Sequence, residues 1–131
     1  MIGLDTSVIL RYFVGDEPTQ AKKAEGIIEA LTPADPGWIC ATVLAELVWA
    51  LTRIYRFNQQ GVIGVIETLL ASDELKVEQS DDMRRALWLY RIGKADFADC
   101  MIAISAQTVG CSKTVTFDKI AARDTGMELL V

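Results

Sequence analysis

Short apolar segments alternate with longer segments of helical periodicity along the whole chain, and this alternation limits the possible folds more than any other feature. The short segments, expected to be strands, lie near residues 2–4, 38–40, 75–77, 114–117 and 127–131. Between them, apolar residues recur every three or four positions, as on the buried face of a helix. The alternation is typical of a parallel sheet covered by helices on both faces. We therefore predict an α/β fold with three α/β/α layers and a mostly parallel sheet.

The length and composition predict a single globular domain over residues 1–131. The apolar residues make up 51% and the charged residues 24% of the chain, a balance that excludes intrinsic disorder. No long linker divides the chain, and its apolar runs are too short to cross a bilayer. The N-terminal residues do not resemble a secretion signal, and the three cysteines have no CxxC spacing. We therefore expect a cytoplasmic protein that does not enter a membrane.

The chain contains no histidine, which excludes a Ser-His or Cys-His pair, a histidine base and histidine metal ligands. Its 13 basic and 18 acidic residues give a net charge of −5. Such a chain is not an obvious partner for nucleic acid, because Lys and Arg supply most of the affinity for phosphates. The objection weakens if several carboxylates bind divalent cations, which would reverse the local charge.

Two aspartates, Asp5 and Asp118, directly follow predicted strands. Ligands of open parallel sheets bind beyond the carboxyl ends of the strands, so both positions are candidates for a functional site. A helix is also predicted after each of them, and an aspartate in that place commonly caps the helix. Both interpretations stay open for each residue taken alone.

Three further carboxylates lie on predicted helices. Glu46 falls in the first turn of a mostly apolar helix, where a surface glutamate is also favourable. Asp99 lies in a helix that is apolar all round, and Asp96 shares its face. Two neighbouring carboxylates without a basic partner repel each other, and a divalent cation would relieve this. Hard oxygen ligands without histidine or cysteine favour Mg²⁺ or Mn²⁺, although both aspartates could instead interact with the helix N-terminus.

Four sequence blocks together resemble the PIN domain family, and within it the VapC-type toxins of toxin–antitoxin pairs. The blocks are DTSV at 5–8, AEL at 45–47, DFADCMIA at 96–103 and TFD at 116–118. Their order and spacing match the family over essentially the whole chain. Cys100 departs from the alanine expected beside Asp99, and a small buried thiol should fit there. The resemblance implies a metal-dependent endoribonuclease that cleaves RNA and pairs with an antitoxin protein.

The resemblance also assigns roles to individual residues. The acidic quartet corresponds to Asp5, Glu46, Asp99 and Asp118. Hydroxyls that support the site correspond to Thr6 and Thr116, and a more variable acidic position corresponds to Asp96. In metal-assisted hydrolysis of a phosphodiester, the three aspartates of the quartet would hold Mg²⁺ or Mn²⁺, while Glu46 would orient or deprotonate the attacking water. We expect the four carboxylates to converge on one pocket.

Basic and aromatic residues suggest the partners. Arg11, Arg53 and Arg56 are candidate phosphate contacts, although each of them taken singly is more typical of a solvated helix face. Trp49 and Trp88 lie on helices whose other residues already supply a core. Exposed aromatic residues mark protein contacts, so we predict a homodimer.

Three alternatives compete with the nuclease interpretation. A haloacid-dehalogenase-type phosphatase would use Asp5 as nucleophile, but it needs a second aspartate where Ser7 stands. A receiver domain would need a phosphate-accepting aspartate after the third strand, where the sequence reads KVEQ at 76–79. A catalytically degenerate PIN domain that serves as a binding scaffold would lack part of the acidic quartet, which is intact here.

Overall fold

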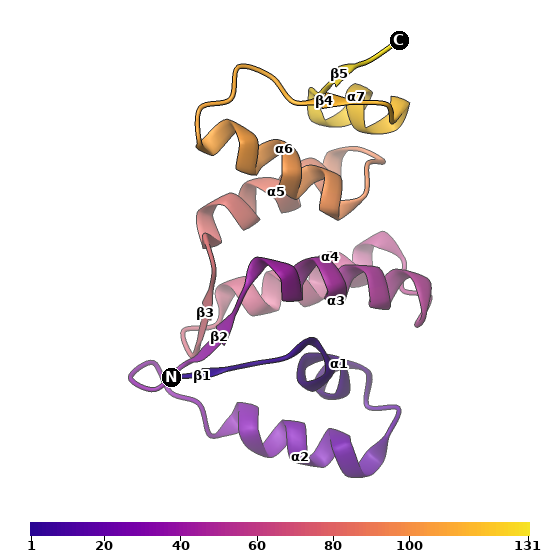
Figure 1. Cartoon of the computed structure of the whole chain (residues 1–131). Coiled ribbons are helices and arrows are strands. Elements are labelled where there is room, and N and C mark those ends of the chain that lie inside the picture. The colour runs from indigo at the N-terminus through magenta and orange to yellow at the C-terminus, as the bar shows by residue number, and fades with distance from the viewer. The chain divides into compact units, whose positions relative to one another are not determined.

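The computed structural model describes all residues, Met1–Val131, and they form two compact units. Unit 1 comprises Met1–Glu78 and unit 2 comprises Gln79–Val131. Figure 1 shows the chain with its helices and strands labelled. No helix has the length and apolar character that a membrane span requires.

Unit 1 contains a parallel sheet of strands β1 (Ile2–Gly3), β2 (Gly37–Ile39) and β3 (Leu75–Val77), with β2 in the centre. Gly37 pairs with Ile2 on one side and with Leu75 on the other. A Cβ atom on Gly37 would lie 2.8 Å from Leu4 Cδ1 and 2.9 Å from Leu31 Cδ1, so a larger residue here would require these two leucine side chains to shift. Because all three strands are parallel, their carboxyl ends lie at one edge of the sheet.

The helices of unit 1 are α1 (Thr6–Val14), α2 (Pro18–Glu29), α3 (Ala41–Arg53) and α4 (Gln59–Ala71). Local sequence signals set several of their ends. Gly15 ends α1 with a φ of 67°, and the Asn58 side chain caps α4 by accepting a hydrogen bond from the Gly61 amide. Pro18 occupies the first turn of α2, where its missing N–H costs nothing.

Two helices of unit 1 start in different ways. Asp5 caps α1, and its side chain accepts a hydrogen bond from the Ser7 amide. Helix α3 begins at Ala41, and its cap residue Cys40 makes no side-chain hydrogen bond. The Ala41 amide instead donates to Glu78 Oε1 over 2.8 Å. A cap that comes from 37 residues away leaves no local pattern in the sequence.

The core of unit 1 is formed by apolar faces of its helices and the central strand. The fully buried side chains are Ile9, Ile39, Leu44, Leu47, Leu51, Val62 and Ile66. Burying each such side chain contributes about 1.5–3 kcal/mol to folding. Helix α1 packs against both α2 and α3, so residues at the start of α1 and in the second turn of α3 are fixed on rigid elements.

Unit 2 contains α5 (Ser80–Ile92), α6 (Phe97–Thr108), α7 (Lys119–Thr125) and the strands β4 (Val115–Thr116) and β5 (Glu128–Leu129). Helix α5 packs on α6. The Tyr90 and Phe97 rings contact each other edge to face, with 5.7 Å between the ring centroids. Gln79 occupies the cap position of α5 and makes no side-chain hydrogen bond there. In the first turn of α5, the buried Asp82 side chain accepts a hydrogen bond from the Thr108 hydroxyl.

The predicted α/β class with parallel pairing is confirmed. Strands β4 and β5 pair in parallel, as do the strands of unit 1. The sequence predicts one sheet for all of these strands, whereas the hydrogen bonds define a sheet of three strands in unit 1 and a sheet of two in unit 2. Strands β1 and β4 are only two residues long, so each has few backbone groups available for pairing.

Candidate active site

Asp5 lies between β1 and α1 in unit 1 and is a helix cap, as one of its two interpretations predicted. Its Oδ2 accepts hydrogen bonds from the Ser7 hydroxyl at 2.7 Å and from the Ser7 amide at 3.4 Å. These bonds, the hydroxyl contact first, lower the pKa of the Asp5 carboxyl below its ordinary value. A hydrogen bond from the Thr6 amide lowers this pKa further. Asp5 is therefore ionised.

Thr6 connects the start of α1 to α3. Its hydroxyl donates to Glu46 Oε1 over 2.8 Å, across 40 residues of sequence. The Thr6 side chain is buried, whereas Glu46 is exposed. This bond fixes one oxygen of Glu46 and leaves Oε2 without a partner. Unit 1 thus places an ionised aspartate next to a threonine that holds a glutamate.

Asp99, in the first turn of α6, is the centre of a negatively charged group in unit 2. Burial raises the pKa of its carboxyl, and the charges of Asp96 and Asp118 raise it further. No Lys or Arg forms an ion pair with any of the three aspartates. The helix is less buried than the sequence suggests, because Asp99 is half-buried and Ile102 is exposed. The predicted repulsion between neighbouring carboxylates is present all the same.

Asp118 follows β4 and caps α7, again as one of its interpretations predicted. Its Oδ1 accepts from the amides of Ile120 at 2.8 Å and Ala121 at 2.9 Å, and its Oδ2 has no partner. The Thr116 hydroxyl accepts a hydrogen bond from the Asp118 amide at 3.0 Å. Thr116 therefore holds the backbone of Asp118 and does not contact its carboxylate. Asp96 occupies the cap position of α6 without a side-chain hydrogen bond.

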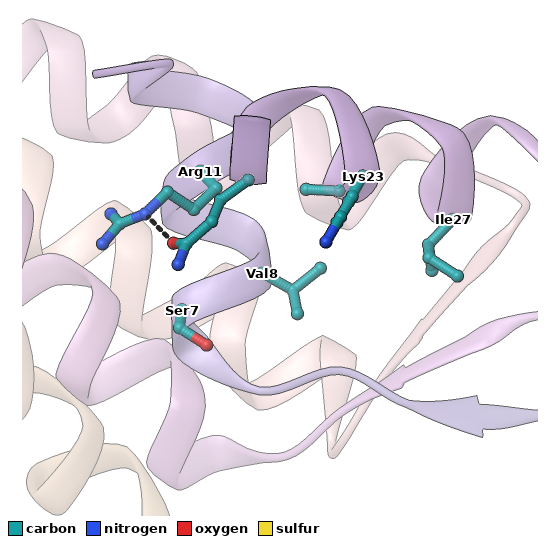
Figure 2. Close-up of a pocket in the computed structure, with 7 residues that line it drawn as sticks. Ser7, Val8, Arg11, Lys23 and Ile27 are labelled. Carbon is teal, nitrogen blue, oxygen red and sulfur yellow. Dashed lines mark hydrogen bonds between the residues drawn. The ribbon is translucent and has the colours of Figure 1, made fainter. Parts of the chain in front are cut away.

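The three predicted phosphate contacts differ in their surroundings. Arg11 is held in place, because its Nε donates to Gln20 Oε1 at 2.7 Å and its Nη1 to the Tyr55 hydroxyl at 3.2 Å (Figure 2 shows the first bond). Arg53 and Arg56 are exposed and form no ion pair. Arg53 lies in the last turn of α3, two helical turns after Glu46 and therefore on the same side of the helix.

The carboxylates fit a hard divalent cation by their chemistry. Glu46 and Asp118 each keep one oxygen without a partner, Asp5 is ionised, and Asp99 lies in an uncompensated negative field. Oxygen donors of this kind suit Mg²⁺ or Mn²⁺. Neither unit alone brings three or more Asp, Glu, His or Cys side chains together as a metal site. Convergence of the four carboxylates, two from each unit, stays a prediction.

Two further side chains, Ser7 and Cys100, bear on the chemistry of the candidate site. Ser7 was not predicted to support the site, yet its hydroxyl holds Asp5. The sequence contains a signal for this contact, because a serine two residues after a capping aspartate is well placed to bond it.

Cys100 is fully buried, as predicted, and burial together with Asp99 raises the pKa of its thiol to about 12. It stays protonated and is no nucleophile.

Comparison with known proteins gives two findings. The model of the PIN domain family matches residues 2–125, which include all the carboxylates described above. A VapC ribonuclease of Aquifex aeolicus (strain VF5) is 28% identical over 117 residues, which cover 88% of this chain and 86% of that protein.

Proposed function

The chain belongs to the PIN domain family, and from this premise we propose that it is an endoribonuclease that requires a divalent metal and acts as the toxin of a toxin–antitoxin pair. The similarity to a VapC ribonuclease along most of both chains supports this proposal. We also propose that residues 1–131 form one PIN domain, since the family match extends over both compact units.

The observation that carries the proposal is the uncompensated charge around Asp99. Burial raises the pKa of its carboxyl, the charges of Asp96 and Asp118 raise it further, and no Lys or Arg forms an ion pair with the three. Aspartates that served only as helix caps would not need to lie where their charges repel one another. Carboxyl groups with shifted pKa values are concentrated at functional sites.

We assign roles by the chemistry of each side chain. Asp5, Asp99 and Asp118 would hold Mg²⁺ or Mn²⁺, and Asp96 would support Asp99. When bound, the metal would supply Lewis acidity toward the phosphate and lower the pKa of an attacking water. Glu46, held through Oε1 by Thr6, would use Oε2 to orient the water and accept its proton. The Thr116 hydroxyl fixes the backbone that presents Asp118.

RNA would be bound partly by arginines. Arg53 and Arg56 carry no ion pair and lie on unit 1, the unit that contains Asp5 and Glu46. Arg11 keeps Nη2 without a hydrogen bond, while Gln20, Tyr55 and Asp16 hold its Nε and Nη1. We propose that all three contact phosphates, Arg11 as a fixed group and the other two as mobile ones.

The proposed partners follow from exposed apolar groups and from the family. Trp49 and Trp88 are each 59% exposed, a large apolar area for a small protein to leave in water. We propose that these tryptophans are buried in a homodimer and that an antitoxin protein blocks the acidic residues. The three cysteines are unpaired, which supports a reducing compartment such as the cytoplasm.

Incubation of the purified chain with total RNA tests the proposal. We expect cleavage with Mg²⁺ or Mn²⁺, no cleavage after addition of EDTA, and recovery when the metal is restored in excess. Activity that survives the chelator would contradict the metal requirement. Complete inactivity with both metals would instead favour a PIN domain that serves only as a binding scaffold.

A further inference from the structure

A pocket lies between α1 and α2 in unit 1, and its volume is about 280 Å³ (Figure 2). Helix α1 contributes Ser7, Val8 and Arg11, and α2 contributes Gln20, Lys23, Ala24 and Ile27. Ligand pockets in proteins usually begin at about 300 Å³. The space is therefore suited to one small group and not to a long segment of a partner.

The charge of the lining favours an anion. Arg11 and Lys23 are the only charged residues that line the pocket, although the chain as a whole has a net charge of −5. Gln20 holds Arg11 through Oε1, and Asp16 forms an ion pair with its Nη1 at 3.5 Å, so the guanidinium is fixed and its charge is partly neutralised. Lys23 is therefore the cation that is available to a ligand. Lys23 forms no hydrogen bond or ion pair, and Figure 2 shows its side chain reaching into the space between the two helices. A basic peptide would be repelled here, whereas a phosphate would pair with Lys23.

The remaining lining is apolar and is located beside the cations. Val8, Ala24 and Ile27 line the pocket, and Ile27 is 49% exposed. The Gln20 amide nitrogen is free to donate, because only its oxygen is used by Arg11. An apolar wall next to a cation and an amide donor suits a nucleotide, whose base needs apolar contact and a polar edge and whose phosphate needs charge.

Ser7 connects the pocket to the proposed catalytic residues. Its side chain lines the pocket, and its hydroxyl donates to Asp5 Oδ2 over 2.7 Å. A group bound in the pocket is therefore one side chain away from Asp5. That spacing suits the nucleotide next to the phosphate that Asp5 would help to cleave.

We propose that this pocket binds one nucleotide of the RNA substrate adjacent to the scissile phosphate, with its phosphate on Lys23 and its base or ribose against Val8 and Ile27. The inference rests on the proposed ribonuclease activity. It adds a substrate-binding residue, Lys23, and a place where the enzyme selects among nucleotides.

Neighbouring lysines on α2 provide a matched test. Lys23 lines the pocket and Lys22 does not, while both are exposed, so neither substitution to alanine should disturb folding. We expect Lys23→Ala to raise KM for a short single-stranded RNA about tenfold and to change kcat less than twofold. Lys22→Ala should change KM less than twofold, and Lys23→Arg should restore most of the loss.

Binding measured without cleavage separates this inference from the proposed function. In EDTA, fluorescence anisotropy with a labelled RNA should show a dissociation constant about five to ten times higher for Lys23→Ala and almost unchanged for Lys22→Ala. Equal effects of the two substitutions, with an active wild type, would overturn the pocket alone. A Lys23-dependent affinity for free nucleoside monophosphate but not for RNA would also overturn it. Wild-type chain that fails to cleave RNA would overturn the proposed function instead.

Discussion

The Thr6 hydroxyl donates a hydrogen bond to Glu46 Oε1 over 2.8 Å and so joins the start of α1 to the second turn of α3. Asp5 immediately precedes Thr6 and is held through its own bond to Ser7. Two carboxylates that are 41 positions apart in the sequence thus depend on three consecutive residues of α1 and its cap. A change at Thr6 should therefore act on Glu46 without moving Asp5.

We expect Thr6→Val to lower kcat/KM for RNA about tenfold, because valine fills the same space but cannot orient Glu46. The free energy of unfolding should fall by about 1 kcal/mol, as for the loss of one hydrogen bond. Steady-state cleavage with Mg²⁺ and urea unfolding measure the two effects. Thr6→Ser keeps the hydroxyl and should retain most of the activity; an equal loss in both variants would show that the hydrogen bond is not the cause.

Asp99→Asn should reduce metal-dependent cleavage on the order of a thousandfold, since the amide keeps the shape but loses the negative charge that would bind the cation. In EDTA at pH 7 the variant should be more stable than wild type, because the raised pKa of Asp99 shows that its charged form is disfavoured in the fold. Asp96→Asn should lose less activity. The measurements are RNA cleavage with and without EDTA and thermal unfolding in EDTA.

The exposed Asp81 provides a control for charge alone, since it contacts only Arg84. Asp81→Asn should leave cleavage within about twofold of wild type. A larger loss in Asp96→Asn than in Asp99→Asn would contradict the roles given to these two aspartates.

The positions of the helices and of the carboxylates could be predicted from the sequence because their signals are local. Gly15, Asn58 and the strand-end aspartates act on residues close to them in the chain. The cap positions of Asp5 and Asp118 could also be anticipated, because an aspartate directly before a helix commonly caps it.

What could not be predicted depends on contacts between distant residues. The bond from Thr6 to Glu46, the cap that Glu78 provides for α3 and the fixing of Arg11 by Tyr55 each join segments more than 35 positions apart. Arg11 shows the consequence. An arginine on a helix surface is expected to be solvated, whereas the fold holds its Nε and Nη1 through Gln20, Tyr55 and Asp16.

Gly93→Ala should destabilise the chain by about 1–2 kcal/mol, because an added Cβ would lie 2.9 Å from Asp124 Cβ and 3.2 Å from its Oδ2. The side chain that must move is the one that accepts the Lys94 amide at 2.7 Å. Gly64→Ala, in the interior of α4 with nothing near the added carbon, should instead stabilise by about 0.5–1 kcal/mol. Urea unfolding of both variants decides the matter; effects of the same sign would refute the argument.

Asp124 should make the stability of the chain depend on pH in a narrow acidic range. Its carboxylate accepts the Lys94 amide and two hydrogen bonds from the Arg123 guanidinium, and these contacts, with Arg123 first, lower its pKa from 3.8 to about 2. A lowered pKa means that the contribution to stability is fully present above pH 4 and is lost as the pH falls through about 2. Asp124→Asn should therefore lower the Tm at pH 7 and pH 5, and the difference from wild type should shrink between pH 4 and pH 2. Thermal unfolding followed by circular dichroism at these pH values measures the difference, with Asp81→Asn as control; a gap that stays constant down to pH 2 would show that the charge of Asp124 does not stabilise the fold.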